Sequence, residues 1–374
     1  MTGAPDTVAL RDDAGADRRV AWPVLRWPLR DIDAWHRARR AGDFLSDDGA
    51  AANWRDATVR AAIGEYGRFL AFQHEHGLLD PNNGPGNRVT PTTLRAYVDF
   101  LQARCSSKTV ASYIGILGMM IQAMAPATDW RWLWDLQTKL QRKSKPSRNK
   151  RSKLVPSREL VRLGQDLMVQ AESATDLPAM RAALAFRDGL MIALLALRPL
   201  RQLNFIAIQI GCHLIRDGES YSLCFTAGEM KAGRPLEFPY PTALLPALNR
   251  YLMVYRPILL GLRDSRGASR QNTLPDAATR LWVTQYGTPV GAFAQTKVIK
   301  KHTAARFGHA LNPHLFRDCA ASSIATEDPE HVQIVALILG HSTLKTAERH
   351  YITAGTRGAT KSYQDLVRTL SEAW

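Results

Sequence analysis

A run of twelve residues, 142–153, limits what this 374-residue chain can fold into more than any other feature. Almost every residue in the run is basic or small, and it holds neither an acid nor an apolar anchor. Such a stretch cannot bury apolar surface, so it predicts a linker rather than part of a core. Helical patterns lie on both sides of it. Because the length also favours two domains over one, we expect a domain on each side of a basic linker at 142–156.

The residues before the linker predict an all-helical domain at 46–141. Apolar residues recur there at helical spacing, and Thr90 followed by Pro91 is typical of an N-cap and the first residue of a helix. Residues 1–45 are expected to be an N-terminal extension, partly disordered, because they begin with a polar and charged stretch. Within this extension a helix is expected only at about 29–41.

The residues after the linker predict a mixed α/β domain at 157–374 that ends in a tail helix. Helical patterns cover about 157–172 and 178–197, and mostly helical sequence resumes at Pro241. Between them lies a short β section. Its two strands are expected at 221–226 and 236–240, with a turn at 231–234. The predicted fold class is therefore mainly α with a small antiparallel β section.

The charge of the chain points to a polyanionic partner. The formal net charge is +15 and the isoelectric point is about 9.9. Basic side chains that neutralise phosphates release condensed counterions, which favours binding to nucleic acid. We therefore expect the basic linker, placed between two domains, to lie along a DNA backbone.

Cysteine spacing and hydropathy indicate the compartment. The four cysteines are widely spaced and form no CxxC pair, which argues against a disulfide framework and a structural zinc site and fits a reducing compartment. The start of the sequence lacks the basic and apolar segments of a secretory signal. The most apolar stretch, 189–200, is interrupted by Arg198 and is too short to span a bilayer. We expect a cytoplasmic, nucleoid-associated protein with no membrane contact.

The most informative candidate catalytic residues lie towards the C-terminus. His314 and Arg317 are three apart on a predicted helix opened by Asn312-Pro313, which places a donor and a cation on one face near a helix start, where an anion can bind. A Leu-Gly-His motif ending in His341 follows, and Tyr351 stands ten residues further on. Each feature alone is common in proteins. Their joint order is what is specific.

This order resembles the C-terminal signature of the tyrosine recombinase family. The family carries another arginine upstream, which Arg201 matches, although Arg198 is a neighbouring alternative and Asn204 stands where the family usually has Glu. It also carries a lysine in a β-hairpin turn between the two arginine motifs, which Lys231 matches. The resemblance covers most of the chain. It implies that the helical domain is a core-binding domain and that the second domain is the catalytic domain of this family.

The resemblance implies a site-specific DNA recombinase or integrase. Tyr351 would attack the DNA backbone and form a 3′-phosphotyrosine link. Arg201 and Arg317 would bind the non-bridging phosphate oxygens, a task that suits the planar and permanently charged guanidinium group.

The resemblance also implies three proton donors or carriers. Lys231 would protonate the leaving 5′ oxygen, His314 would assist proton transfer near the nucleophile, and His341 would donate to a phosphate oxygen. No metal, ATP or other cofactor is expected, because the covalent link conserves the energy of the phosphodiester bond. The acidic residues form no cluster that indicates a magnesium site, and no Gly-rich phosphate loop is evident.

The implied partner is a double-stranded DNA recombination site. The resemblance suggests a homo-oligomer, expected as a tetramer on two DNA sites, with exchange of the C-terminal tail between subunits and with accessory proteins as further partners. Most DNA contacts are expected to be with phosphates. The basic residues expected to make them are Lys108, Lys143, Lys145, Arg148, Lys150 and Arg151.

Two alternatives fit the same residues. An enzyme resembling type IB topoisomerases would use similar chemistry to nick and reseal one duplex without strand exchange. A catalytically inactive DNA-binding protein would keep the fold alone, although all six expected catalytic positions are filled. Integration, excision, resolution, inversion and transposon mobility are all open as the role of a recombinase with this sequence.

Overall fold

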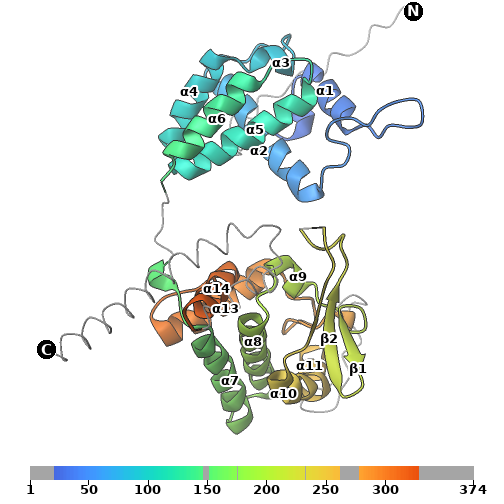
Figure 1. Ribbon diagram of the computed structural model, residues 1–374, viewed down its shortest axis with the longest axis vertical. Coiled ribbons are helices and arrows are strands. Elements are labelled where there is room, and N and C mark those ends of the chain that lie inside the picture. Colours follow the sequence, from blue (N-terminus) through green and yellow to red (C-terminus); the bar gives the residue numbers. More distant parts are fainter. Residues whose placement is uncertain (1–20, 146–150, 175, 232, 262–277, 328–374) are drawn as a thin grey trace, which may run out of the picture. The chain divides into compact units, whose positions relative to one another are not determined.

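The computed structural model of the chain describes residues 21–145, 151–174, 176–231, 233–261 and 278–327. The chain divides into two compact units, Met1–Asn149 and Lys150–Trp374 (Figure 1). We call them the N-terminal unit and the C-terminal unit. Each has its own hydrophobic core.

The named elements in the described part of the N-terminal unit are all helices. Local signals explain several of its helix starts: Thr90 caps one helix in a capping box with Thr93, and the Ser106 side chain caps the next by accepting from the Thr109 N–H. The elements are η1 (Val24–Arg26), α1 (Leu29–Arg39), α2 (Asp56–Glu75), α3 (Pro85–Arg88), α4 (Pro91–Gln102), α5 (Ser107–Met124) and α6 (Arg131–Lys143).

The core of this unit begins earlier in the sequence than expected. Trp22, Trp27 and Trp35 are all buried in it, within a stretch that the sequence suggested was an extension ending at residue 45. The N–H of Trp22 donates to the carbonyl oxygen of Gly67 at 3.0 Å, and a Cβ at Gly67 would lie only 2.1 Å from the Trp22 oxygen. The extension therefore joins the helical unit through a backbone contact with α2 that only glycine permits. Trp22 and Trp27 lie outside any α-helix, so no helical periodicity marks them as buried.

The C-terminal unit is mainly helical and carries one small sheet. Its helices include the two predicted at 157–172 and 178–197. The elements are η2 (Arg151–Lys153), α7 (Ser157–Ser173), α8 (Ala179–Leu197), α9 (Gln202–Ile206), β1 (Leu214–Asp217), β2 (Ser220–Phe225), β3 (Leu236–Pro239), η3 (Thr242–Leu244), α10 (Leu245–Arg250), the π-helix η4 (Tyr251–Tyr255), α11 (Arg256–Leu259), α13 (Ala292–Phe307) and α14 (Pro313–Glu327).

Within the described residues, β1, β2 and β3 form one antiparallel sheet in that order. Leu223 of β2 pairs with Leu214 on one side and with Phe238 on the other. The pair β2 and β3 matches the predicted hairpin, whereas β1 was not predicted. Only the first residue of β1 is buried, so the strand lacks the alternation that marks a half-buried strand. The predicted fold class, mainly α with a small antiparallel β section, is confirmed.

Helix α8 forms the centre of the C-terminal core. Twelve of its residues are buried, and it packs against α7 where Gly164 and Gly189 face each other. A Cβ on either glycine would lie 2.5 Å from the carbonyl oxygen of the other, so the two backbones meet closely there. Helices α11 and α14 also contact α8. None of the helices in the described part of the chain is long and apolar enough to cross a membrane.

Candidate active site

Helix α14 begins with the local cap that its sequence predicts. The N–H of Leu315 donates to the Asn312 side-chain oxygen at 3.0 Å, and Pro313 is the first helical residue. His314 is exposed at the start of this helix, whereas Arg317, one turn further on, is buried with 5% of its surface exposed. The short motif therefore presents one accessible imidazole and one buried guanidinium.

Arg317 is held against the segment that leads from α8 to α9. Its Nη1 donates to the carbonyl oxygen of Pro199 at 2.6 Å. Burial and, to a smaller extent, the positive charge of Arg201 lower the pKa of Arg317 to about 10, against the opposing effect of Asp318. Because that pKa is still well above 7, Arg317 is a cation at neutral pH. The fold thus brings together two guanidinium groups that are far apart in the sequence.

Arg201 and its neighbour Arg198 face different surroundings. Arg201 is the half-buried N-cap residue of α9, and its positive charge lowers the pKa of Arg317. Arg198 instead donates to the carbonyl oxygen of Pro239 at 3.3 Å, and its guanidinium lies over the Phe238 ring, 5.4 Å from the centroid. Arg198 is therefore directed to β3, which favours Arg201 as the partner of Arg317.

Lys231 lies exposed in the connection between β2 and β3. The residue before it, Met230, is buried in the core with 4% of its surface exposed. The side-chain amide of Asn204, on α9, donates to the carbonyl oxygen of Glu229 at 3.1 Å. This bond connects α9, which begins directly after Arg201, with the loop that carries Lys231.

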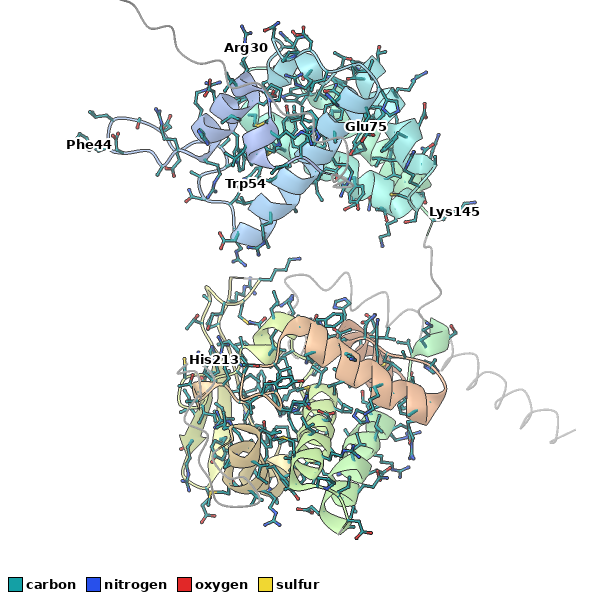
Figure 2. All side chains as sticks on the ribbon, turned by 180° about the vertical axis from the view of Figure 1, so that it is seen from behind. Arg30, Phe44, Trp54, Glu75, Lys145 and His213 are labelled. Atoms are coloured by element: carbon teal, nitrogen blue, oxygen red, sulfur yellow. The ribbon has the colours of Figure 1, made fainter. Side chains whose placement is uncertain are left out.

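Two further residues of this region, His213 and Glu229, were not predicted from the sequence. The His213 Nε2 and Glu229 Oε1 atoms are 2.7 Å apart, and the other carboxylate oxygen accepts from the Thr226 N–H and hydroxyl, each at 2.8 Å. These hydrogen bonds lower the pKa of Glu229 to about 2, and the bond from His213 has the largest effect. The spacing Thr-x-x-Glu is the local signal that could have revealed half of this network. Figure 2 labels His213 in the C-terminal unit.

His341 and Tyr351 lie outside the described residues, as does the C-terminal tail after them. The described part of the candidate site therefore consists of Arg201, Lys231, His314 and Arg317. A pair of guanidinium groups suits a phosphodiester, because each can donate two hydrogen bonds to its non-bridging oxygens.

Three of the residues expected to contact DNA lie at one end of the N-terminal unit. The N–H of Lys145 donates to the Ser107 side chain at 3.1 Å, Lys108 follows Ser107 on α5, and Lys143 is the last residue of α6. All three lysines are exposed, and Figure 2 shows Lys145 at the edge of the unit.

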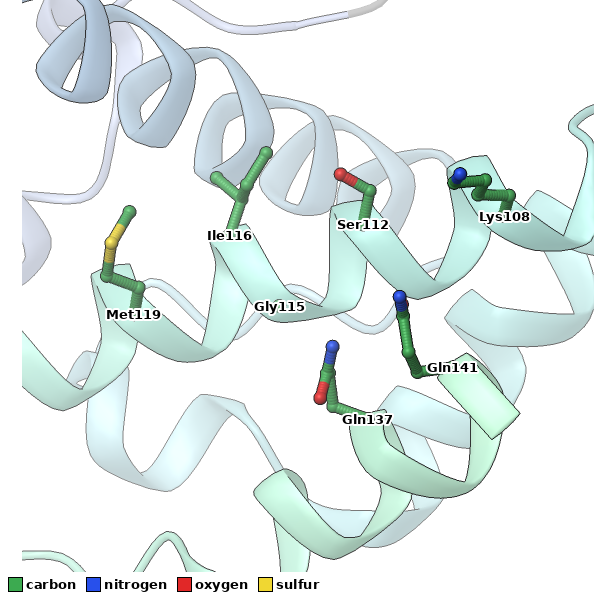
Figure 3. Close-up of a pocket in the computed structure, with 7 residues that line it drawn as sticks. All are labelled: Lys108, Ser112, Gly115, Ile116, Met119, Gln137 and Gln141. Atoms are coloured by element: carbon green, nitrogen blue, oxygen red, sulfur yellow. The ribbon is translucent and has the colours of Figure 1, made fainter. Parts of the chain in front are cut away.

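Lys108 also lines a groove between α5 and α6 (Figure 3). The remaining lining residues are mostly small, apolar or amide-bearing: Ser112, Gly115, Ile116, Met119, Gln137 and Gln141. Of the other basic residues expected at DNA, Arg148 and Lys150 lie outside the described residues, and Arg151 begins η2.

No protein-family model and no curated protein sequence matches the chain. Solved structures do match it. The XerH site-specific recombinase bound to difH substrate, as a pre-cleavage complex, has a TM-score of 0.52 at 12% identity, over 79% of this chain and 76% of that one. The XerH post-cleavage complex with palindromic difH has a TM-score of 0.51 at 11% identity, over 82% and 78%.

A transposon enzyme has a similar structure. The Tn1549 transposon integrase, in complex with a circular intermediate DNA, has a TM-score of 0.51 at 15% identity. The match covers 81% of this chain and 91% of that one. At such low identity these similarities concern the fold.

Proposed function

Because this chain has the fold of the tyrosine recombinases, we propose that it is a site-specific DNA recombinase that cuts and rejoins strands through a 3′-phosphotyrosine intermediate. The observation that carries the proposal is the hydrogen bond from Arg317 to the carbonyl oxygen of Pro199, two residues before Arg201, which holds a buried cation of the helix that bears His314 against the segment of Arg201. Two guanidinium groups held together in this fold make a site for one phosphodiester.

In the proposed reaction Tyr351 attacks the phosphorus atom of the scissile phosphodiester. A bond forms between the phenol oxygen and phosphorus, and the bond from phosphorus to the 5′ oxygen breaks. Arg201 and Arg317 stabilise the charge on the non-bridging oxygens, which is where negative charge develops. The products are a 3′-phosphotyrosine and a free 5′ hydroxyl.

The remaining groups are assigned to proton transfer. Lys231 donates a proton to the departing 5′ oxygen, His314 assists removal of the phenol proton, and His341 donates to a phosphate oxygen. Rejoining reverses these steps with a different 5′ hydroxyl. The phosphotyrosine bond conserves the energy of the original bond, so the reaction as proposed uses no metal or ATP.

The proposed partner is duplex DNA. The XerH structure contains its difH substrate and the Tn1549 integrase structure contains a circular intermediate DNA. In this chain, exposed lysines gather at one end of the N-terminal unit. We assign Lys108, Lys143 and Lys145, with the neighbouring Arg148, Lys150 and Arg151, to phosphate contacts. In this proposal the active species is a tetramer on two sites that exchanges its C-terminal tails, and it acts on cytoplasmic DNA.

The first test is covalent trapping in cells, since it works without knowing which DNA site the protein uses. Cells that produce the protein are lysed in denaturant, and the DNA that stays attached to it is sequenced. We expect wild type to carry covalently bound DNA from discrete sites and Tyr351→Phe to carry none, because phenylalanine has no oxygen with which to form the link.

Three results would contradict parts of the proposal. Covalent DNA on Tyr351→Phe would show that another residue is the nucleophile. DNA binding without any covalent DNA on wild type would favour the inactive DNA-binding protein. If the recovered site is nicked and resealed by a monomer, with no exchange between two duplexes, the topoisomerase-like alternative is the better description.

A further inference from the structure

The loop of residues 226–230, directly before Lys231, is held in place by hydrogen bonds and by one buried side chain. Hydrogen bonds within the loop join its first and fourth residues, because both the N–H and the hydroxyl of Thr226 donate to Glu229 Oε2 at 2.8 Å. Met230 then places its side chain in the core of the C-terminal unit. Lys231, the next residue, is exposed, so its backbone is anchored from one side while its amine is free to reach outwards.

His213 fastens this loop to the segment before β1. The N–H of Gln209 donates to His213 Nδ1 at 3.1 Å, so Nδ1 must be the unprotonated ring nitrogen. The proton therefore resides on Nε2, which donates to Glu229 Oε1 at 2.7 Å. His213 is only 5% exposed, and the pKa of Glu229 lies at about 2, so the acceptor is a carboxylate at neutral pH. Hydrogen bonds to a charged acceptor are the stronger kind.

Asn204 fastens the same loop to α9. Its side-chain amide donates to the carbonyl oxygen of Glu229, and Asn204 is 9% exposed. A carboxylate at this position has no proton to donate and would place negative charge against a carbonyl oxygen. This gives a physical reason for Asn in place of the Glu that is usual in tyrosine recombinases. Arg201 occupies the N-cap position of the same short helix, three residues earlier.

We propose that Asn204, His213 and Glu229 form a latch that positions Lys231 relative to Arg201, an inference that rests on the recombinase function proposed above. The path runs from Arg201 along α9 to Asn204, across one hydrogen bond to Glu229, and along two residues to Lys231. None of the latch residues needs to touch DNA. They are positioning residues, and their effect on cleavage passes through the proton that Lys231 delivers to the 5′ oxygen.

A flexible lysine needs such support. Its four-carbon side chain loses conformational freedom when the amine is fixed beside a leaving group, and a displacement of about 1 Å can cost about 100-fold in rate. Anchoring the backbone directly before Lys231 reduces the number of positions the amine can occupy. The latch should therefore affect departure of the 5′ oxygen and leave the binding of the phosphate by Arg201 and Arg317 unchanged.

The test compares two versions of one nicked duplex that carries the site recovered by covalent trapping. In one version the leaving atom is the natural 5′ oxygen, and in the other it is sulfur, which leaves as a thiolate without needing a proton. Single-turnover cleavage is measured for wild type, Glu229→Ala, Asn204→Asp and Lys231→Ala. Glu219→Ala, which removes an exposed carboxylate in the same sheet region, is the matched control.

We expect Glu229→Ala and Asn204→Asp to cleave the oxygen substrate about 100-fold more slowly than wild type. Both should return to within about fivefold of wild type on the sulfur substrate, as Lys231→Ala should, because that substrate bypasses the proton donor. Recovery on sulfur also shows that the variants are folded. Glu219→Ala should match wild type on both substrates.

Equal losses on both substrates would overturn the latch, because the residues would then act on folding or on phosphate binding. Unimpaired cleavage of the oxygen substrate by both variants would overturn it as well. If wild type cleaves neither duplex, the proposed recombinase function fails first. If wild type cleaves both duplexes and the variants show no defect specific to the oxygen substrate, the latch is overturned and the recombinase function still stands.

Discussion

Arg317 is a buried cation that lies beside a second cation. Burial and the charge of Arg201 both lower its pKa, to about 10, and the carbonyl oxygen of Pro199 accepts one of its hydrogen bonds. Keeping like charges together costs free energy in the protein without DNA. A phosphodiester between them would offset that cost, so the pair is better suited to holding an anion than to stabilising the fold.

Replacing Arg317 by Lys tests this geometry at the level of one residue. Lysine keeps the charge but loses the planar fork that can bind Pro199 and a phosphate oxygen at the same time. We expect single-turnover cleavage of the trapped site to fall about 100-fold or more, on both the oxygen and the sulfur substrates. Arg306→Lys, at an exposed arginine paired with Asp166, serves as the control. A rate within about threefold of wild type would remove Arg317 from the proposed site.

The contact between α2 and α4 contains a buried carboxyl group. Glu65 is 2% exposed, accepts a hydrogen bond from the Tyr97 hydroxyl at 2.7 Å, and pairs with Arg68. Burial nevertheless dominates and raises the pKa of Glu65 to about 7. A polar group of this kind fixes how two helices meet, since it must stay within reach of its partners.

This carboxyl group makes the stability of the N-terminal unit depend on pH. The unfolded chain releases the Glu65 proton near pH 4.5, whereas the folded chain keeps it until about pH 7. The resulting stabilisation is complete below pH 4.5 and is lost as the pH rises through 7. Compared with Glu65→Gln, wild type should lose free energy of unfolding on the order of 3 kcal/mol between pH 4.5 and 8.

Tryptophan fluorescence during urea unfolding measures this difference. Most tryptophans precede the basic linker, at positions 22, 27, 35, 54, 130, 132 and 134, so the signal reports mainly on the N-terminal unit. If wild type and Glu65→Gln show the same pH dependence, Glu65 does not titrate in this range. Tyr113 lies next to the pair of Glu65 and Arg68, with its ring centroid 4.3 Å from the Arg68 guanidinium. Tyr113→Phe keeps the ring and leaves Glu65 in place, so this variant should retain the wild-type profile.

At the scale of the whole molecule, the basic surface should govern how DNA affinity responds to salt. The net charge is +15, and exposed Lys108, Lys143 and Lys145 gather at one end of the N-terminal unit. Each phosphate contact contributes about 0.9 to the slope of log affinity against log salt concentration. Replacing all three lysines by Gln should therefore reduce that slope by about 2 to 3.

Fluorescence anisotropy with a labelled duplex, between about 50 and 200 mM salt, measures the slope. The control replaces two arginines whose charges are already paired, Arg162 with Glu159 and Arg250 with Glu172. Its slope should stay close to that of wild type. An unchanged slope in the triple lysine variant would show that this end of the unit does not contact DNA.

Local sequence determined the features that depend on neighbouring residues. The caps at Thr90 and Asn312, the two long helices α7 and α8, and the hairpin of β2 and β3 all follow from spacing and turn residues. These features form because each group finds its partner within a few positions along the chain. The strand β1 escaped prediction because its exposed residues show no periodicity.

The same sequence, through the order of His314, Arg317, His341 and Tyr351, determined the chemistry that we propose. Which distant groups meet depends instead on how the whole chain packs. Packing brought Arg317 to the segment that ends at Arg201, joined Asn204 of α9 to the loop before Lys231, and buried the early tryptophans in the helical core. The reason is physical: such contacts join residues tens of positions apart, and their partners are selected by packing and burial of the whole unit, which leaves no periodic trace in the sequence.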